Sequence, residues 1–218
     1  MTGLDATLQR MVETEQARGT VHGPVLRVQS GDGRLDFRGA AGAAEAGIRF
    51  PIASVSKMFT AALTLQLCDE GALDLDQSVQ NALPGVDLTG LHVVKGIDHG
   101  PHLTIRQLLF QTSGLADYYE GGVARDLIRS RDYAYDVSDV LDCAKTLPPH
   151  AAPDSGRAHY SDTNFQLLGA VVEAATGMSY GEAVQDRICA PLGLTRTALF
   201  DAARDGDGQT LPVWHKDQ

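Results

Sequence analysis

The sequence predicts an α+β protein with sheet-forming stretches at both ends and a helical part between them. Apolar and polar residues alternate in the sheet-forming part at about 20–50, and a strand-like pattern returns at 195–218 around LPVWH. Between about 54 and 190, apolar residues recur at helical spacing behind clear helix start signals. We find no internal repeat or interdomain linker, so residues 1–218 are predicted to form a single domain.

The first elements are an amphipathic helix and a hairpin. The helix is predicted over about Leu4–Arg18, with Gly19 just beyond its end. Its apolar face comprises Leu4, Leu8, Met11 and Val12. PVLRVQS (24–30) and RLDFRGA (34–40) then alternate about Gly31-Asp32-Gly33, where the glycines supply the positive φ of a hairpin turn.

The helical part begins with MFTAALTLQLC (58–68), which is apolar on nearly every side and is therefore expected to be buried. Three later helix starts carry capping boxes: Thr104/Gln107, Thr163/Gln166 and Ser179/Glu182. Three helix ends carry a glycine: Gly71, Gly177 and Pro191-Leu192-Gly193.

Composition excludes several classes of partner. The formal charge is −10, and no run of lysines or arginines reverses it locally, so we expect neither nucleic acid nor an anionic membrane as a partner. No stretch approaches the roughly 18 apolar residues that a membrane span needs. The first residues form neither a basic nor an apolar leader, and if Met1 is the native start we expect a cytoplasmic protein.

The cysteines and histidines do not indicate a metal centre. Cys68, Cys143 and Cys189 are widely spaced and odd in number, and we interpret them as reduced core residues. His99 and His102 lie in a Gly/Pro loop where they share no helical face, so we interpret this segment as a surface loop. No metal or organic cofactor is predicted.

The most informative motif is Ser54-Val55-Ser56-Lys57. Ser-x-x-Lys at a helix start places a hydroxyl and an amine one turn apart on the same face, as a serine nucleophile with its own base requires. The N–H groups and dipole of the helix N-terminus would favour the developing oxyanion and lower the pKa of Lys57. Ser56 faces away from this pair.

The segment FPIASVSKMFTA (50–61) resembles the nucleophile segment of the serine β-lactamase and penicillin-binding-protein superfamily, in particular its class C-like, esterase-type branch. Four further segments continue the resemblance in order: GALDLDQSVQNALPG, LTIRQLLFQTSGLADYY, HYSDTNFQLLGAVVEAATGMSY and APLGLTRTALF. The resemblance implies an antiparallel sheet flanked by helices, an inserted all-helical lobe, and an active site between the two.

The resemblance also assigns roles to later residues. Tyr160 stands at the tyrosine of the family's Tyr-x-Asn motif, which implies that its phenol relays the proton from nucleophile to leaving group. Asp162 stands where the family has asparagine. A carboxylate there would hold Lys57 protonated and lack the amide donor for a substrate carbonyl, unless it is simply a helix N-cap. Tyr118 and Tyr119 follow a turn that lies near the mouth of the family's site, and they line the substrate pocket or pack in the core.

We therefore predict a serine hydrolase that forms an acyl-enzyme on Ser54, with Lys57 as general base, Tyr160 as relay and Asp162, Tyr118 and Tyr119 binding substrate. A carboxylic ester is the first choice of substrate. A β-lactamase or D-alanyl-D-alanine carboxypeptidase is the alternative enzyme, and a non-catalytic relative with a binding role is the alternative from another class.

The family's third motif, Lys-Thr-Gly or His-x-Gly on a strand, is not found between Tyr160 and Gln218. The resemblance implies that this strand supplies an oxyanion donor. We therefore expect the 218 residues to be a truncated or cleaved portion of a longer hydrolase, inactive or very weakly active alone. Such a portion would dimerise or bind a complementary C-terminal chain.

Overall fold

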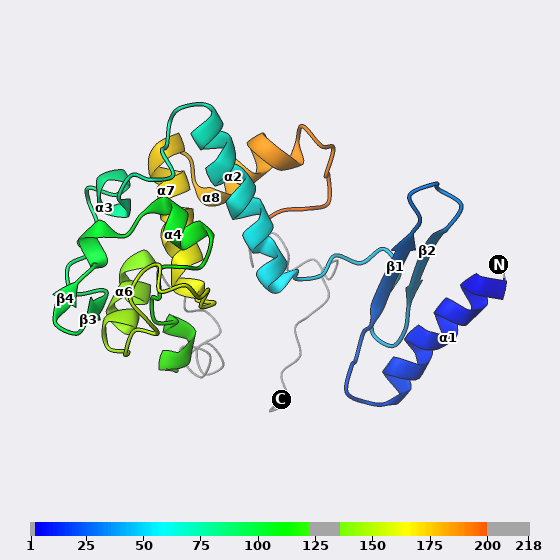
Figure 1. Cartoon of the computed structure of the whole chain (residues 1–218). Helices are drawn as coiled ribbons and strands as arrows, with labels where there is room; N and C mark the ends of the chain where they lie inside the picture. The colour runs from blue at the N-terminus through cyan, green and yellow to red at the C-terminus, as the bar shows by residue number, and fades with distance from the viewer. Residues whose placement is uncertain (1–2, 123–135, 200–218) are drawn as a thin grey trace. The chain divides into compact units, whose positions relative to one another are not determined.

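A computed structural model describes residues 3–122 and 136–199 (Figure 1). The described residues divide into two compact units, residues 3–53 with Leu199 and residues 54–198. The single-domain organisation stays a prediction, and the LPVWH segment lies outside the described residues.

The first unit is a helix beside a hairpin. Helix α1 (Gly3–Ala17) lies along strands β1 (Val25–Gln29) and β2 (Asp36–Ala40), which pair antiparallel with Val25 opposite Ala40 and Gln29 opposite Asp36 (Figure 1). Gln9 Nε2 on α1 donates to the carbonyl of Ala40 at 3.1 Å. The predicted helix and hairpin are confirmed.

Two details of this unit differ from the prediction. Val12 is buried, but Leu4 and Met11 are 51% and 57% exposed, because the two-stranded hairpin covers only one stripe of α1. In the turn, Gly33 takes a left-handed φ of 71° and Gly31 does not, so only one of the two glycines is required by backbone conformation.

The second unit is mainly helical. Its longest helices are α2 (Lys57–Asp69) and α7 (Asp162–Thr176). The shorter helices are α3 (Val79–Ala82), α4 (Ile105–Leu109), α6 (Val137–Lys145) and α8 (Tyr180–Val184). A small ladder pairs β3 (Val93–Val94) with β4 (Ile97–Asp98). Short 3₁₀ or π turns are η1 (Ala53–Ser56), η2 (Gly100–His102), η3 (Tyr118–Gly121) and η4 (Gln185–Cys189).

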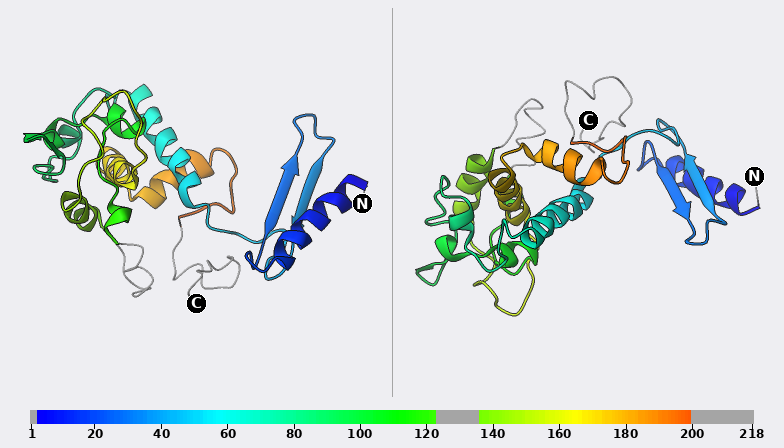
Figure 2. Two further views of the ribbon diagram at one scale, coloured as in Figure 1. Left: turned by 60° about the horizontal axis from the view of Figure 1, so that its bottom comes forward. Right: turned by 90° about the horizontal axis from the view of Figure 1, so that it is seen from above.

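Helix α7 is the centre of this unit. It packs against α2, α4, α6 and α8, and Figure 2 shows it running between α2 and α6. The core at this centre is fully buried and aliphatic, and includes Leu63, Leu67, Leu167, Leu168 and Val171. The first residues of α2 and α7 thereby take fixed positions relative to each other.

The expectation that α2 is buried all round is wrong. Leu63 and Leu67 are buried in the same core as the apolar residues of α7, but Met58 is 71% exposed and Leu65 is 44% exposed. The other helices of the unit cover one stripe of α2, and an apolar sequence alone does not report how many neighbours a helix has.

The capping predictions are confirmed at Thr104 and Ser179 and wrong at Thr163. Helix α7 begins at Asp162, so Thr163 lies inside the helix. Its hydroxyl donates to the carbonyl of Ala116 at 2.7 Å and accepts from Tyr118 N at 3.0 Å. The Thr163 hydroxyl therefore bonds to residues distant in sequence, although the local pattern predicted that it would cap the helix.

The predicted glycine stops are confirmed, since all three take left-handed φ: Gly71, Gly177 and Gly193. Cys189 is buried, and Cys68 and Cys143 are partly buried. Within the described ranges, no group of three or more His, Cys, Asp and Glu could hold a metal ion. In the same part of the chain, no helix is long and apolar enough to cross a membrane.

Candidate active site

The Ser-x-x-Lys motif crosses a change of helix type. Ser54 lies on the 3₁₀ turn η1, and Lys57 is the first residue of α2, so the serine sits one turn before the α-helix instead of on its first turn. In a 3₁₀ turn residues three apart eclipse, which places both side chains on the same side. Lys57 Nζ donates to Ser54 Oγ at 3.3 Å.

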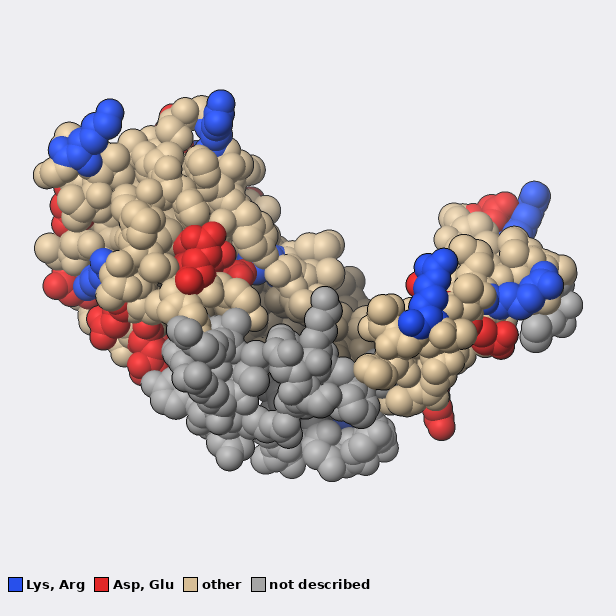
Figure 3. Space-filling view, turned by 90° about the horizontal axis from the view of Figure 1, so that it is seen from below, with Lys and Arg blue, Asp and Glu red and all other residues tan. Residues whose placement is uncertain are grey.

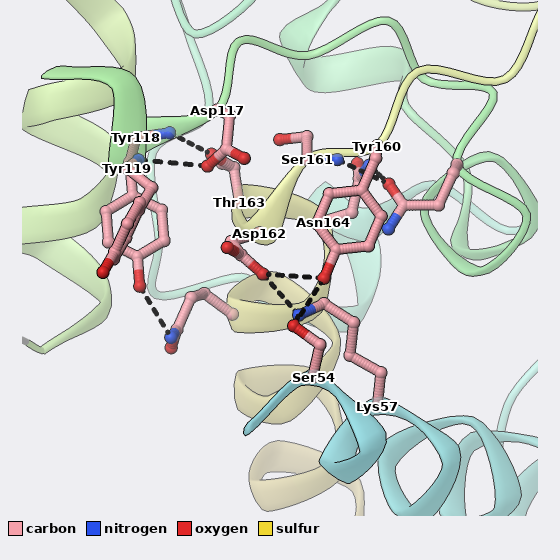
Figure 4. A network of polar contacts seen from close by, with 12 residues as sticks. Ser54, Lys57, Asp117, Tyr118, Tyr119, Tyr160, Ser161, Asp162, Thr163 and Asn164 are labelled. Atoms are coloured by element: carbon pink, nitrogen blue, oxygen red, sulfur yellow. Dashed lines mark hydrogen bonds and ion pairs between the residues drawn. The ribbon is translucent and has the colours of Figure 1, made fainter. Parts of the chain in front are cut away.

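Tyr160 and Asp162 approach the same hydroxyl from the start of α7. The Tyr160 hydroxyl donates to Ser54 Oγ at 2.8 Å and lies 3.4 Å from Asp162 Oδ1. Lys57 Nζ also forms an ion pair with Asp162 Oδ1. Figure 4 shows the four side chains converging, with Ser54 and Lys57 from one segment and Tyr160 and Asp162 from another. The structure thus brings together residues over a hundred positions apart.

The environment of Lys57 favours its charged form. Its side chain is 17% exposed, and Nζ lies 5.0 Å from the ring centroid of Tyr160 and 5.6 Å from that of Phe165. Burial acts to lower the pKa of Lys57, but hydrogen bonding and charge at Asp162 and Tyr160 outweigh burial and raise the pKa above its usual value. The expected lowering of the Lys57 pKa is therefore wrong.

Asp162 is not the N-cap of α7. Ser161 occupies that position, without a capping bond from its side chain, and Asp162 is the first helical residue. Its carboxylate is 26% exposed and binds Lys57, so of the two readings of Asp162 the structure favours the ionic one.

Comparisons with known proteins show the family of the chain. The family model described as Beta-lactamase matches residues 5–214, which is nearly the whole chain. The chain belongs to the β-lactamase family. The fold prediction is confirmed with it, since solved structures of this fold superpose on most of the chain.

Two curated relatives and one solved structure show what this β-lactamase-family chain is similar to. It is 35% identical over 179 residues to penicillin-binding protein 4 of Amycolatopsis lactamdurans, covering 76% of this chain and 43% of the relative. It is 31% identical over 153 residues to monacolin J acid methylbutanoyltransferase of Aspergillus terreus, covering 66% and 36%. A solved D-stereospecific amidohydrolase from Streptomyces sp. superposes with a TM-score of 0.73 at 34% identity, covering 87% and 55%.

The chain therefore spans about half or less of the length of the relatives it matches. Of the two units, residues 54–198 contain Ser54, Lys57 and Tyr160.

The two predicted pocket tyrosines lie on η3, at the side of Asp162 away from Ser54 (Figure 4). The Tyr118 hydroxyl accepts from Gln166 Nε2 at 3.3 Å, and burial raises the pKa of its phenol. Tyr119 is 49% exposed, and its ring meets the Tyr118 ring edge-on at 6.4 Å. Tyr118 is a partly packed residue and Tyr119 is open to solvent, and contact of either with substrate stays a prediction.

Sequence reasoning missed the polar loop that supports this β-lactamase-family site. Gln111 and Ser113 of that loop bond to Asn164, which is fully buried on α7. A polar residue two positions after Asp162, on the apolar side of a helix, is the signal in the sequence that could have revealed it.

Proposed function

We propose that this protein is a serine hydrolase that forms a covalent acyl-enzyme on Ser54. The observation that carries the proposal is that Ser54 Oγ is hydrogen-bonded by both Lys57 Nζ, at 3.3 Å, and the Tyr160 hydroxyl, at 2.8 Å. Both contacts donate to Ser54 Oγ, and once Lys57 is neutral the Tyr160–Lys57 pair can take the serine proton instead, which is what activation of a serine nucleophile requires.

The reaction follows from these contacts. Ser54 Oγ bonds to the substrate carbonyl carbon while its proton passes through Tyr160 to neutral Lys57. The tetrahedral adduct collapses, the bond to the leaving group breaks, and the leaving oxygen takes that proton. Water then adds to the acyl-serine ester, releases the acid and restores Ser54.

Asp162 favours an ester as the substrate. The carboxylate holds the Lys57 ammonium and raises its pKa, so the ammonium gives up its proton less readily. An amine leaving group needs that proton more than an alkoxide of an activated ester does. A carboxylate also lacks the N–H donor that an asparagine would offer to a substrate carbonyl.

Amide hydrolysis is the second candidate, and the likeness to a D-stereospecific amidohydrolase at 34% identity favours it. A β-lactam or D-alanyl-D-alanine peptide is an amide substrate of this kind, and the 35% identity to penicillin-binding protein 4 supports including it.

Steady-state assays separate these candidates. The protein is supplied with a p-nitrophenyl ester of a short acid, a D-amino acid p-nitroanilide and a chromogenic cephalosporin. We expect kcat/KM to be highest for the ester. A higher value for the anilide or the cephalosporin would make the protein an amidase or a β-lactamase, and binding without turnover of any of the three would indicate a non-catalytic role.

We further propose that an oxyanion donor comes from polypeptide outside the described residues, supplied by a second copy or by a complementary C-terminal chain. The support is that the matched relatives are about twice as long as this chain. Removing one oxyanion donor typically lowers the rate by about 10²–10³. Size-exclusion chromatography with activity measured across the peaks would show whether turnover follows an oligomer.

The cytoplasmic location and the absence of nucleic-acid partners stay predictions. On the described part of the face in Figure 3, basic side chains stand apart from one another and form no continuous basic surface, which supports the second of them. Cell fractionation tests the first.

A further inference from the structure

Tyr160 is placed accurately although it is poorly covered. Tyr160 is 54% exposed and lies on the irregular segment that leads into α7. Its hydroxyl nevertheless lies 2.8 Å from Ser54 Oγ. Packing of the ring against a core does not account for this position, so the backbone around Tyr160 must be held.

One residue holds the backbone on both sides of Tyr160. The carbonyl oxygen of Gln111 accepts a hydrogen bond from His159 N at 2.8 Å. The side-chain Oε1 of Gln111 accepts another from Ser161 N at 3.0 Å. The two bonds flank Tyr160 and fix the direction in which its side chain leaves the chain.

Gln111 reaches this position through an uncommon backbone conformation. It follows α4 with a left-handed φ of 59°, which residues other than glycine seldom adopt. Its own N–H bonds back to the carbonyl of Leu108 at 3.1 Å, and its carbonyl is left to accept from His159. A glycine would take this turn at lower cost, but it would have no side chain to reach Ser161.

A buried amide fixes the orientation of the Gln111 side chain. Asn164 Nδ2 donates to Gln111 Oε1, and Asn164 Oδ1 accepts from Ser113 Oγ at 2.7 Å. Asn164 and Ser113 are fully buried, where hydrogen bonds are strong and an unpaired group is costly. Because Asn164 lies on α7 two residues after Asp162, the network connects the loop after α4 to the start of α7.

We propose that Gln111 is a positioning residue that sets the Tyr160 phenol against Ser54. It does not touch the nucleophile and acts through Tyr160. The measured effect on turnover rests on the proposed hydrolase function, whereas the placement of Tyr160 does not.

The kinetic test uses Gln111→Met, which keeps the length of the side chain and removes its acceptor oxygen Oε1. We expect kcat for an ester to fall about tenfold or more with little change in KM, because a displaced catalytic group loses alignment. In a Tyr160→Phe background the same change should cost less than about twofold. Gln111→Glu, which keeps an acceptor oxygen, should recover most of the activity.

Gln80→Met is the matched control. The Gln80 amide also bridges backbone groups, donating to Val86 O at 2.6 Å and accepting from Leu88 N at 3.1 Å, but far along the chain from Tyr160. The Gln80→Met substitution should lower the melting temperature of the protein without lowering kcat. An equal loss of kcat in Gln80→Met, or Gln111→Met and Tyr160→Phe losses that multiply, would overturn the proposal.

A crystal structure of Gln111→Met provides the readout that needs no activity. We expect the Tyr160 oxygen to leave hydrogen-bond distance of Ser54 Oγ or to split between conformers. If the wild-type protein turned over no ester, the proposed function would fail, and this structure would still decide the inference. An unmoved Tyr160 in the variant would refute it.

Discussion

Lys57 divides its hydrogen bonds between a nucleophile and a carboxylate. Its Nζ donates to Ser54 Oγ and to Asp162 Oδ1, and the second contact is ionic. The same amine must be neutral to accept a proton and charged to pair with Asp162. For the proposed reaction, the balance between these two states sets the pH range of turnover.

Asp162→Asn tests that balance. The raised pKa of Lys57 means that the neutral base forms only as pH rises, so kcat/KM for an ester should climb with pH. Asparagine removes the negative charge, lowers the Lys57 pKa and should move this rising limb to lower pH. Ester turnover at pH 7 should stay within about tenfold, and any amide turnover should improve.

Asp76→Asn is the control for this pH shift, because Asp76 pairs with Arg106 and lies outside the site. Its profile should match the wild type. A rising limb that stays in place, or moves upward, in Asp162→Asn would show that Asp162 does not hold the Lys57 proton. A large loss of ester turnover would instead make Asp162 a working part of the site.

Lys57→Ala and Tyr160→Phe test the shared proton path. Each should lower kcat/KM for an ester by about 10²-fold or more, the range for a positioned acid or base. The double variant should lose much less than the product, since both groups bond to one Ser54 oxygen. Losses that multiply would assign the two residues to separate roles.

For single residues, the sequence predicts the site correctly where the interacting residues are close together in the chain. Ser54 and Lys57 are three positions apart, so their proximity follows from helical geometry. Tyr160 could be predicted only through the family resemblance. Gln111 could not, because its role depends on a left-handed turn and on bonds to residues about fifty positions away.

The element that brings the site together is the start of α7, and local pattern misplaced it by two residues. The capping boxes at Thr104 and Ser179 form as predicted because each is closed within one turn. Thr163 carries the same pattern, yet its hydroxyl bonds to Ala116 and Tyr118 from the loop after α4. These hydrogen bonds fix the start of α7 through residues distant in sequence, and a pattern within one helix does not predict them.

Gly114→Ala tests how closely this loop packs. Gly114 has φ 71°, and a Cβ there would lie 2.2 Å from the carbonyl oxygen of Ala151. Gly177 has φ 69°, with nothing within 4 Å of an added Cβ. Gly177→Ala should lower the free energy of unfolding by about 1 kcal/mol, the cost of left-handed backbone.

Gly114→Ala should lower it further, by at least another ~1 kcal/mol, because backbone must move to admit the methyl group. Urea unfolding of the two variants and the wild type measures both values. Equal losses would show that the loop yields easily and that Ala151 does not confine Gly114.

At the scale of the whole molecule, the candidate catalytic groups and the β1–β2 hairpin belong to separate units. Residues 54–198 contain Ser54, Lys57, Tyr160 and Asp162, while the hairpin belongs to residues 3–53. The fold class could be predicted because five segments match the family in order. The arrangement of the two units could not be predicted, because it depends on contacts that the described residues do not contain.

Complementation tests the proposal that another polypeptide supplies an oxyanion donor. Purified 1–218 should turn over an ester at about a hundredth or less of the rate it reaches when mixed with a separately produced C-terminal half of a related full-length enzyme, since one oxyanion donor is worth about 10²–10³. A mixture with an unrelated protein of the same size is the control. Full activity from 1–218 as a monomer would show that this chain supplies every group it needs.

Acylation of Ser54 tests the central claim most directly. The protein is treated with a fluorophosphonate probe, its intact mass is measured, and the adduct is located by peptide mass spectrometry. We predict one adduct, on the peptide that contains Ser54, with labelling that slows in Lys57→Ala and Tyr160→Phe and is lost in Ser54→Ala. An adduct on another residue, or labelling that persists in Ser54→Ala, would contradict the account.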